Sequence, residues 1–396
     1  MYVNIEFLDT EQIENVITAL HHKVDKTIFI GYEDVPERFK EKTAEFLRDY
    51  CDVKEIVYKD VSKTDLYDIL QKLREVVDEE TNAGNQIFFD ITGGEGLILV
   101  AFGMLAKEYS LPIHQYDIIT DEIHEMNKDD AKPISAYTEL KKKKVTLDLD
   151  TYIKMKGAVI SSKKVSGEMD TSNATFIKKT ELLWDVLCDY KEMWNKYAEL
   201  LSGTFGTKTL YADAIVDSGK VADFVDFENY LAAIQDTESI HKLRITTVSK
   251  ENEPVRKRIS FFYDSEDMKR CLIKAGNVLE LHTYQMMKKQ SFDCKQSIMI
   301  DWDGVEHKER GKDVLNEVDV ISIKGNVPVF ISCKGGKMDE GQALEPMYEL
   351  ATVANRFGGK YAQKVLSLVH PMKEVNIKRA EEMNIELRYY GKEDKC

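Results

Sequence analysis

The sequence lacks the motifs that usually mark redox, zinc or nucleotide-cofactor chemistry. Its six cysteines contain no CxxC pair and its eight histidines no HExxH spacing, so it predicts neither a disulfide framework nor a zinc site. It also has no dinucleotide fingerprint and no Walker lysine, which argues against binding of NAD or ATP. No apolar run approaches a membrane span and no signal peptide is recognisable. We therefore expect a cytoplasmic protein without a membrane partner.

Positive charge is also scarce. The chain has 55 Lys and Arg against 70 Asp and Glu, a net charge of −15. Because basic residues drive phosphate binding, this argues against broad, tight binding of duplex nucleic acid and leaves only a local basic groove. The basic residues do form clusters, most of which we expect to be solvated surface. They lie at residues 141–144, 163–164, 178–179, 256–258, 288–289 and 308–312.

Near the C-terminus, two β-branched, apolar runs at 316–321 and 329–334 flank a Gly-Asn turn, which predicts a β-hairpin. Side chains two apart on a strand share a face, so Asp319 lies with Glu317 and Lys334 with Ser332. Carboxylates beside an ammonium suit metal-assisted phosphodiester hydrolysis, in which the metal activates water and Lys neutralises developing charge. The same pattern is also compatible with a simple cross-strand ion pair on a surface hairpin.

The segments around this hairpin complete a recognisable order of elements. Residues 277–287 have helical apolar spacing and place Glu280 among apolar neighbours, where a carboxylate needs a partner or a metal unless it lies at the solvated edge. A second helix at 343–357 ends at a Gly-Gly pair, and a strand at 362–370 and a helix and strand at 376–390 follow. Helix, hairpin, helix, strand is the order of the PD-(D/E)xK nuclease core.

These segments resemble the nuclease half of CARF-domain PD-(D/E)xK endonucleases, which are ancillary effectors of type III CRISPR antiviral defence activated by cyclic oligoadenylate. The resemblance rests on residues 276–280, 316–319, 331–334 and 357–359. It implies that Mg²⁺ or Mn²⁺ is bound by Glu280, Asp319 and the backbone carbonyl of Cys333. It also implies that Lys334 orients or activates the attacking water.

One position departs from this family. The superfamily pattern often has a carboxylate where this chain has Ser332, and a hydroxyl is a poor ligand for a hard cation. Either another acid replaces it, with Glu317, Glu345 and Glu349 as candidates, or the metal site is weakened. The neighbouring Cys333 could be a nucleophile, but its place inside a strand favours a buried apolar thiol.

The N-terminal part alternates strands with helices, which predicts a doubly wound parallel sheet. The expected strands are 2–8, 27–32, 53–58 and 86–90, and the expected helices 13–22, 36–50, 63–79 and 97–109. Ligands of such sheets bind beyond the C-terminal strand ends. Here those ends carry Asp9 and Thr10 and the turn Thr92, Gly93, Gly94 and Glu95. Its free amides suit an anion, although the turn could be a simple connection.

With this topology, Thr92-Gly93-Gly94 resembles the signature loop of CARF domains. The resemblance implies a Rossmann-like sensor that forms a homodimer and binds a cyclic oligoadenylate, with cyclic tetra-adenylate as the expected ring. The family loop commonly continues with Thr and Lys, whereas this chain has Glu95 and Gly96. An acid beside phosphodiesters weakens their binding, which leaves the ring size open.

The middle of the chain carries no chemistry that we can assign. Residues 181–201 predict one amphipathic helix, and the polar stretch 161–174 a linker. We therefore expect an α/β protein with a CARF-like sensor at 1–147, a helical connecting region at 148–255 and a PD-(D/E)xK nuclease domain at 256–396.

The function expected from these features is a metal-dependent endonuclease acting on DNA or RNA, with single strands or nicked duplex as substrates. The alternative is a catalytically weak or inactive module that senses nucleotides or binds nucleic acid, for which Ser332, Glu95 and the acidic surface argue.

Overall fold

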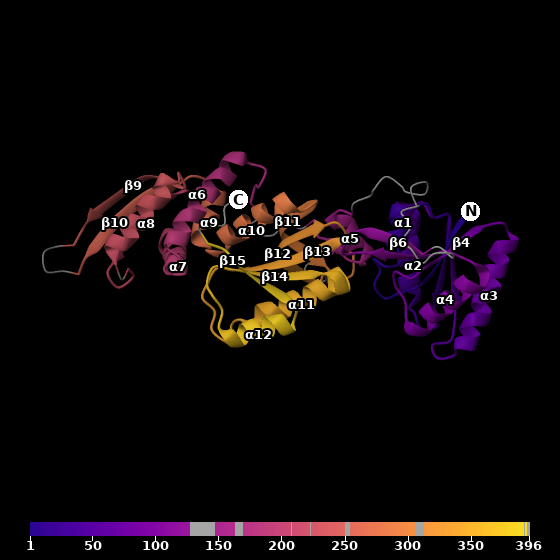
Figure 1. Cartoon of the computed structure of the whole chain (residues 1–396). Helices are drawn as coiled ribbons and strands as arrows, with labels where there is room; N and C mark the ends of the chain where they lie inside the picture. Colours follow the sequence, from indigo (N-terminus) through magenta and orange to yellow (C-terminus); the bar gives the residue numbers. More distant parts are fainter. Residues whose placement is uncertain are drawn as a thin grey trace.

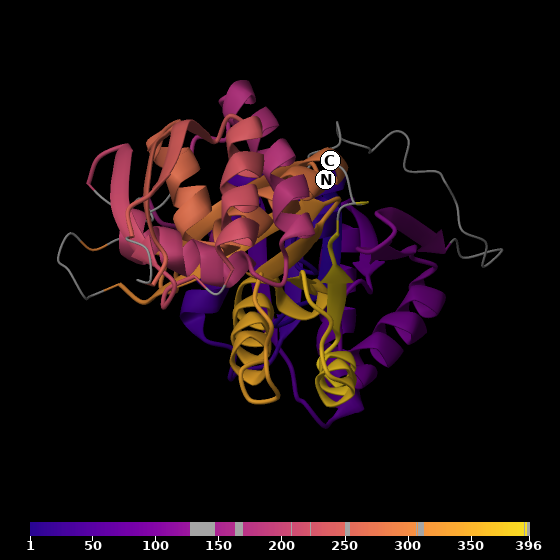
Figure 2. The same cartoon turned by 90° about the vertical axis from the view of Figure 1, so that its left-hand side faces the viewer.

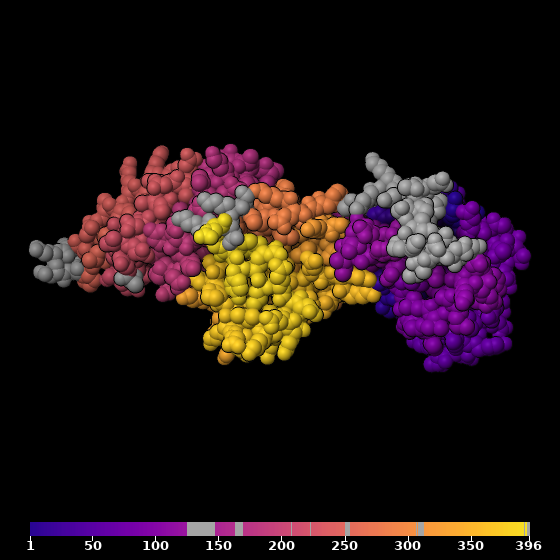
Figure 3. All heavy atoms as spheres, in the orientation of Figure 1, coloured from indigo at the N-terminus to yellow at the C-terminus, as the bar shows by residue number. Residues whose placement is uncertain are grey.

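The computed structural model describes residues 1–126, 147–162, 169–206, 208–221, 223–249, 254–305, 307, 313–391 and 393. These residues form three sheets arranged in a row along an elongated molecule (Figure 1). The N-terminal residues make a body at one end, the C-terminal residues fill the centre, and a small third sheet lies at the far end (Figure 3). No helix among the described residues has the length and apolarity to cross a membrane.

The N-terminal sheet has six strands in the order β3-β2-β1-β4-β5-β6, all parallel except β6. The strands are β1 Tyr2–Phe7, β2 Lys26–Gly31, β3 Glu55–Asp60, β4 Gln86–Asp90, β5 Ile113–Asp117 and β6 Glu122–Met126, and the helices α1 Ile17–His21, α2 Glu37–Cys51, α3 Leu66–Asn82 and α4 Gly96–Tyr109. Strands β1 and β2 are buried almost throughout, as expected when helices cover both faces of a sheet. The prediction of a doubly wound fold is confirmed.

The next part contains helices α6 Ala174–Asp189, α7 Trp194–Phe205 and α8 Phe224–Asp236, and the antiparallel strands β8 Tyr211–Asp217, β9 Ile240–Thr247 and β10 Arg256–Tyr263. The prediction of one helix over 181–201 is wrong, because the chain turns between Asp189 and Trp194. The turn brings the rings of Trp184 and Trp194 to 5.7 Å, whereas ten residues of straight helix would separate them by about 15 Å along its axis. Part of the expected linker, residues 163–168, lies outside the described residues, as do the basic clusters at 141–144, 163–164 and 308–312.

The central sheet has the order β15-β14-β13-β12-β11-β7. The predicted hairpin is β12 Leu315–Lys324 and β13 Val327–Lys334, closed by Gly325 at φ +60°. Strand β14 Gln363–Leu368 lies parallel to β13, and β15 Ile385–Tyr389 parallel to β14. Strand β11 Asp293–Asp301 adds an antiparallel neighbour to β12, and the short β7 Val159–Ile160, which follows α5 Leu149–Met155, completes the edge.

Helices cover both faces of this central sheet. Helices α11 Leu344–Gly358 and α12 Glu374–Glu382 lie side by side on one face, with the 3-10 turn η1 Gly359–Tyr361 directly after α11 (Figures 1 and 2). Helix α10 Gly276–Gln290 packs on the other face against β11, β12, β13 and α6. The short α9 Glu266–Ile273 joins β10 of the small sheet to α10. The expected order of helix, hairpin, helix and strand is confirmed.

The N-terminal and central sheets meet at a group of polar side chains, which we call the junction: the buried Glu11, Glu14 and Lys156, the exposed Lys360 and the half-buried Tyr361. The Glu11 side chain pairs with Lys156 and accepts the Lys360 backbone N–H at 2.9 Å. The Glu14 side chain, 1% exposed, pairs with the Lys360 amine at 2.7 Å and accepts a hydrogen bond from the Tyr361 hydroxyl. These ion pairs and hydrogen bonds tie the segment after β1 to the residues directly after α11.

Candidate active site

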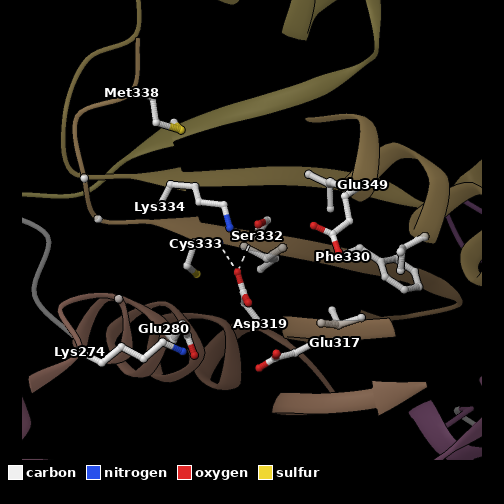
Figure 4. Close-up of a pocket in the computed structure, with 17 residues that line it drawn as sticks. Lys274, Glu280, Glu317, Asp319, Phe330, Ser332, Cys333, Lys334, Met338 and Glu349 are labelled. Carbon is white, nitrogen blue, oxygen red and sulfur yellow. Dashed lines mark hydrogen bonds between the residues drawn. The ribbon is translucent and has the colours of Figure 1, made fainter. Parts of the chain in front are cut away.

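A pocket of about 490 Å³ lies where α10, the β12–β13 hairpin and α11 meet. Its lining includes Glu280, Asp319 and Lys334, the three side chains that the sequence predicts to act together (Figure 4). Glu317 and Ser332 also line it, and along each strand these polar residues are more exposed than Val318 and Cys333 beside them, as strand alternation predicts. The structure thus brings these side chains together on one cavity.

Two donors from β13 hold the Asp319 carboxylate. Its Oδ2 accepts the backbone N–H of Cys333 at 2.7 Å and the Ser332 hydroxyl at 3.2 Å. Among the described residues, no hydrogen bond engages Oδ1. Ser332, at the position where the family pattern has an acid, thus orients Asp319 and leaves one of its oxygens available to a ligand.

Glu280 lies near the start of α10, and 7% of its surface is exposed. Burial and, after it, the negative charges of Asp319 and Glu317 raise the pKa of its carboxyl to about 7, while Lys274 and a hydrogen bond from Ser297 oppose the rise. Ser297 of β11, whose φ is +45°, donates to Glu280 Oε2 at 3.4 Å. Two buried carboxylates that repel one another are stabilised by a cation between them.

Of the three acids that could replace the missing carboxylate, the structure brings two into the pocket. Glu317 and Glu349 line it, whereas Glu345 is exposed one turn earlier on α11 and does not. Figure 4 shows Glu349 reaching over β13 from α11, on the side of the sheet opposite Glu280.

The acidic side chains of the pocket are suited to binding a divalent ion. Carboxylate oxygens from Glu280 and Asp319 are ligands that Mg²⁺ and Mn²⁺ accept. Across the described ranges, no three His, Cys, Asp or Glu side chains are spaced to enclose a metal. The side chains thus fit an open site, in which backbone and water oxygens would supply the other ligands.

The Cys333 side chain is not a nucleophile. Its thiol is buried, and burial together with the charges of Asp319 and Glu280 raises its pKa well above the usual range. A thiol held in the neutral form is unreactive. This confirms the interpretation of a buried apolar thiol.

At the other end of the molecule, the predicted ligand-binding residues meet at the C-terminal edge of the N-terminal sheet. Asp9 and Thr10 follow β1, and Thr92 to Glu95 follow the adjacent parallel strand β4. Asp9 Oδ2 accepts the Gly94 N–H at 3.2 Å, and a Cβ on Gly93 would lie 3.1 Å from Asp9 Cβ. Gly94 has a φ of +137°, which only glycine adopts readily. The loop is thus packed directly against the segment that leads to the junction.

Glu95, which departs from the family's loop sequence, has a hydrogen-bond partner in the structure. Glu95 Oε2 accepts the Tyr32 hydroxyl at 2.8 Å, and burial and this acid raise the pKa of Tyr32 to about 12. Thr92 Oγ1 accepts the Tyr116 N–H at 2.8 Å. Glu95 is thus held toward β2 by Tyr32.

Residues 266–394 match the sequence model of the family described as "Card1-like, endonuclease domain". We refer to residues 266–394 by this description, as the Card1-like endonuclease domain. The pocket lies in this domain, because Glu280, Asp319, Lys334 and Glu349 are all within the match. A search of the curated proteins found no match to the chain.

Solved structures share the fold of the whole chain as well as that of the Card1-like endonuclease domain. Protein VC1899 from Vibrio cholerae matches with a TM-score of 0.69 and 16% identity, over 98% of this chain and 94% of its own. Can2 from Sulfobacillus thermosulfidooxidans, solved in complex with cyclic tetra-adenylate, matches with a TM-score of 0.66 and 14% identity, over 97% and 92%. The predicted fold class and the resemblance to CARF-domain endonucleases are confirmed.

Sequence reasoning missed two polar residues around the pocket of the Card1-like endonuclease domain. Lys274 precedes α10 and acts on Glu280 through its charge, and Ser297 donates to it. Lys274 follows an ordinary amphipathic helix, and Ser297 meets Glu280 only through the packing of α10 on β11. Neither position has a sequence signal that could have revealed its role.

Proposed function

We propose that this protein is a metal-dependent endonuclease activated by a cyclic oligoadenylate bound to its N-terminal sensor in a homodimer. The observation that carries the proposal is the convergence of Glu280, Asp319 and Lys334 on one pocket of a Card1-like endonuclease domain. The substrate is DNA or RNA in single-stranded form or as nicked duplex, since a chain of charge −15 is poorly suited to grip intact duplex.

The pocket residues have distinct roles in phosphodiester hydrolysis. Glu280 and Asp319 would hold Mg²⁺ or Mn²⁺ together with the Cys333 carbonyl, and the ion would supply water activation and charge neutralisation. Asp319 is oriented by Ser332 and the Cys333 N–H. Lys334, at the end of β13, places its ammonium beside Asp319, where it orients the water and neutralises charge on the phosphate (Figure 4).

The activator assignment rests on the loop at the edge of the N-terminal sheet. The Gly93-Gly94 turn opens onto α4, and amides at a helix N-terminus favour phosphate oxygens. Can2, which shares the fold, was solved with cyclic tetra-adenylate. We therefore propose cyclic tetra-adenylate as the activator, with Asp9, Thr10, Thr92 and Glu95 around the ring.

The junction supports transmission of that signal within one chain. Asp9 contacts the ligand loop, and the residues that follow it include Glu11 and Glu14, which hold Lys360 directly after α11. Helix α11 in turn carries Glu349 into the pocket. An activator that displaces the loop therefore acts on a helix that lines the nuclease site.

Cleavage assays with catalytic variants test the proposal. Purified protein is incubated with Mn²⁺, cyclic tetra-adenylate or cyclic hexa-adenylate, and single-stranded DNA, RNA or supercoiled plasmid. We expect activator-dependent cleavage that falls by about 100-fold or more in Asp319→Asn and in Lys334→Met, because each removes a charge from the reacting centre.

The control is Lys337→Met, which removes an exposed lysine that pairs with Glu192 and does not line the pocket. It should cleave at the wild-type rate. Absence of cleavage with every activator and substrate would refute the proposal, as would full activity of Asp319→Asn.

A second candidate function, a regulatory module with weak or no catalysis, is favoured by one observation. Ser332 replaces an acid of the family pattern, and Glu349 reaches the pocket only from the opposite side of β13. If Glu349 does not complete the site, then metal binding by two carboxylates alone is weak.

The two candidates make opposite predictions for Glu349→Gln. If the enzyme is active and uses Glu349, we expect the variant to lose about tenfold in rate and to require more Mn²⁺, as positioning acids around a metal do. Glu345→Gln, on the same helix and outside the pocket, should match the wild type. Equal rates and equal Mn²⁺ dependence of both variants would show that Glu349 does not contribute to the site.

A further inference from the structure

The three-stranded sheet at the far end of the molecule has one covered and one open face. Its covered face packs residues such as Val216, Ile259 and Phe261 against α7 and α8. The open face carries Tyr211 and Ile215 from β8, Arg258 and Phe262 from β10, and Lys242 and Arg244 from β9. Large apolar side chains on an exposed sheet face are a mark of a binding surface.

The aromatic residues of the open face lie next to one another. Tyr211 and Phe262 are paired across β8 and β10, with ring centroids 4.8 Å apart, and they are 43% and 40% exposed. Ile215, which is paired with Arg258 further along β8, is 55% exposed. Exposed planar rings on an open sheet are suited to stacking against flat ligands such as nucleobases.

Cations surround these rings. The Lys242 amine lies 5.4 Å from the centre of the Phe262 ring. Arg258 is clamped by Asp213 through two hydrogen bonds, at 2.9 and 2.6 Å, and its side chain is still 60% exposed. Within the described ranges, neither Lys242 nor Arg244 forms an ion pair with a carboxylate. A chain with a net charge of −15 thus concentrates cations beside aromatic rings at one place.

We propose that the open face binds single-stranded nucleic acid and holds the strand that the nuclease pocket cuts. Bases stack on Tyr211 and Phe262, while Lys242 and Arg244 neutralise the phosphates. The proposal rests on the proposed function only for the statement that the bound strand is the substrate. The open face thus provides binding affinity to a chain whose overall negative charge repels nucleic acid.

The charge pattern favours this occupant over two others. A second copy of the chain meeting the same face across a two-fold axis would place these cations against one another. An acidic peptide would satisfy the cations but offers no regular series of flat rings for Tyr211 and Phe262. Single-stranded nucleic acid supplies both phosphates and bases.

The surface also adjoins the nuclease pocket through the chain. Strand β10 continues into α9, and α9 leads to Lys274 and Gly276 at the edge of the pocket. At the opposite rim, Asn195 of α7 lies against Gly336, so that a Cβ on this glycine would be 2.6 Å from the Asn195 amide. A helix beneath the small sheet therefore lies against the border of the pocket.

Binding is measured on the full chain carrying Glu280→Gln and Asp319→Asn, in EDTA and without activator, so that no cleavage or activation is needed. The probe is a labelled single-stranded oligonucleotide of about 20 nucleotides, followed by fluorescence anisotropy at several salt concentrations. We expect Phe262→Leu to weaken binding by about fivefold or more. Arg244→Gln and Lys242→Gln should each weaken binding and lower its salt dependence.

Matched variants keep the result specific. Tyr67→Leu removes a more exposed aromatic from α3, and Lys59→Gln removes an exposed strand lysine from β3. Both should bind as the parent does. The parent should bind an abasic oligonucleotide of equal length more weakly than the normal strand. The parent and Phe262→Leu should bind this abasic strand with equal affinity.

Three results would overturn the proposal: unchanged binding in the open-face variants, equal affinity of the parent for the abasic and normal strands, or concentration-dependent self-association that the same variants abolish. Loss of nuclease activity in the wild type with intact open-face binding would refute the proposed function alone. Intact cleavage with no open-face binding would refute this inference alone.

Discussion

The Glu280 carboxyl shows how a single residue can couple catalysis to stability. It is buried in the pocket with its pKa raised to about 7 from an ordinary value of 4.5. The folded protein therefore retains this proton to higher pH than the unfolded chain does. The free energy of unfolding should fall as the pH rises from about 4.5 to about 7, and the protein without metal is least stable where Glu280 is charged.

The residue-scale prediction concerns Glu280→Gln. This variant keeps the shape and removes the buried charge, so without metal it should be more stable than the wild type at about pH 8, by up to about 3 kcal/mol. At about pH 5, where Glu280 is protonated, the two should unfold alike. Urea unfolding in EDTA at both pH values measures the difference, and cleavage by the variant should be lost.

Glu317→Gln is the control, because Glu317 is an exposed acid of the same pocket. It should show little dependence of its stability difference on pH. A stabilisation of Glu280→Gln that is the same at both pH values would contradict the pKa assignment.

At the residue scale, strand alternation alone predicted that Asp319 and Lys334 share a pocket. It could not predict the hydrogen bond from the Cys333 N–H to Asp319, because that contact depends on how β12 and β13 are offset. It also could not choose among Glu317, Glu345 and Glu349. Their positions depend on how α11 packs on the sheet.

At the scale of elements, a bulge explains why sequence analysis missed β9. The register between β9 and β10 shifts near Lys242, whose φ is +57°. A bulge inserts one residue and reverses the alternation of faces. In β9, Ile240 is buried, and after the bulge Leu243 and Ile245 pack against the same core. A search for strict alternation over this strand therefore fails.

Helix α4 is the second element of interest, because its outer surface is apolar. Val100 and Met104 are 50% and 48% exposed, one turn apart, and Gly96 and Gly103 lie on the same exposed side. Helix α4 begins directly after the ligand loop. An apolar helix face with small residues is suited to close self-association, which places the expected dimer contact beside the activator site.

The element-scale prediction is that Val100→Glu converts a homodimer to a monomer, because it would place two carboxylates in an apolar contact. Sedimentation velocity measures the change, and affinity for cyclic tetra-adenylate should fall with it. Tyr67→Glu on α3, at a residue 73% exposed, should remain dimeric. A wild-type monomer, or a dimer that Val100→Glu leaves intact, would contradict this contact.

Over the whole molecule, the junction is the direct contact between the N-terminal sheet and helix α11. Burial raises the pKa of Glu14, and its neighbours Lys360 and Tyr361 oppose that rise. Sequence analysis could not find this contact, since Glu11 and Glu14 are nearly 350 residues from Lys360 and Tyr361. Such long-range pairs carry no local pattern.

The whole-molecule prediction is that Glu14→Gln uncouples the sensor from the nuclease. The variant loses the charge that holds Lys360, so activator affinity should be retained while activator-dependent cleavage falls by about tenfold, a coupling loss of ordinary size. Isothermal titration with cyclic tetra-adenylate and the cleavage assay measure the two quantities separately.

A matched variant separates coupling from stability. Glu80→Gln breaks a buried ion pair with Lys26 inside the N-terminal body, away from the junction. It should lower the free energy of unfolding while the ratio of activated to basal cleavage is unchanged. If both variants reduce that ratio equally, the junction has no specific role in activation.

Gly359 has a φ of +71°, and a Cβ built on it would lie 2.0 Å from the Glu11 carboxylate. The end of α11 can therefore seat against the segment after β1 only if this residue has no side chain. Anyone who builds a chimera by exchanging the N-terminal body for that of another protein must transplant residues 9–16 together with 358–361. A hybrid that exchanges the N-terminal body without these two segments would join two folded halves that do not communicate.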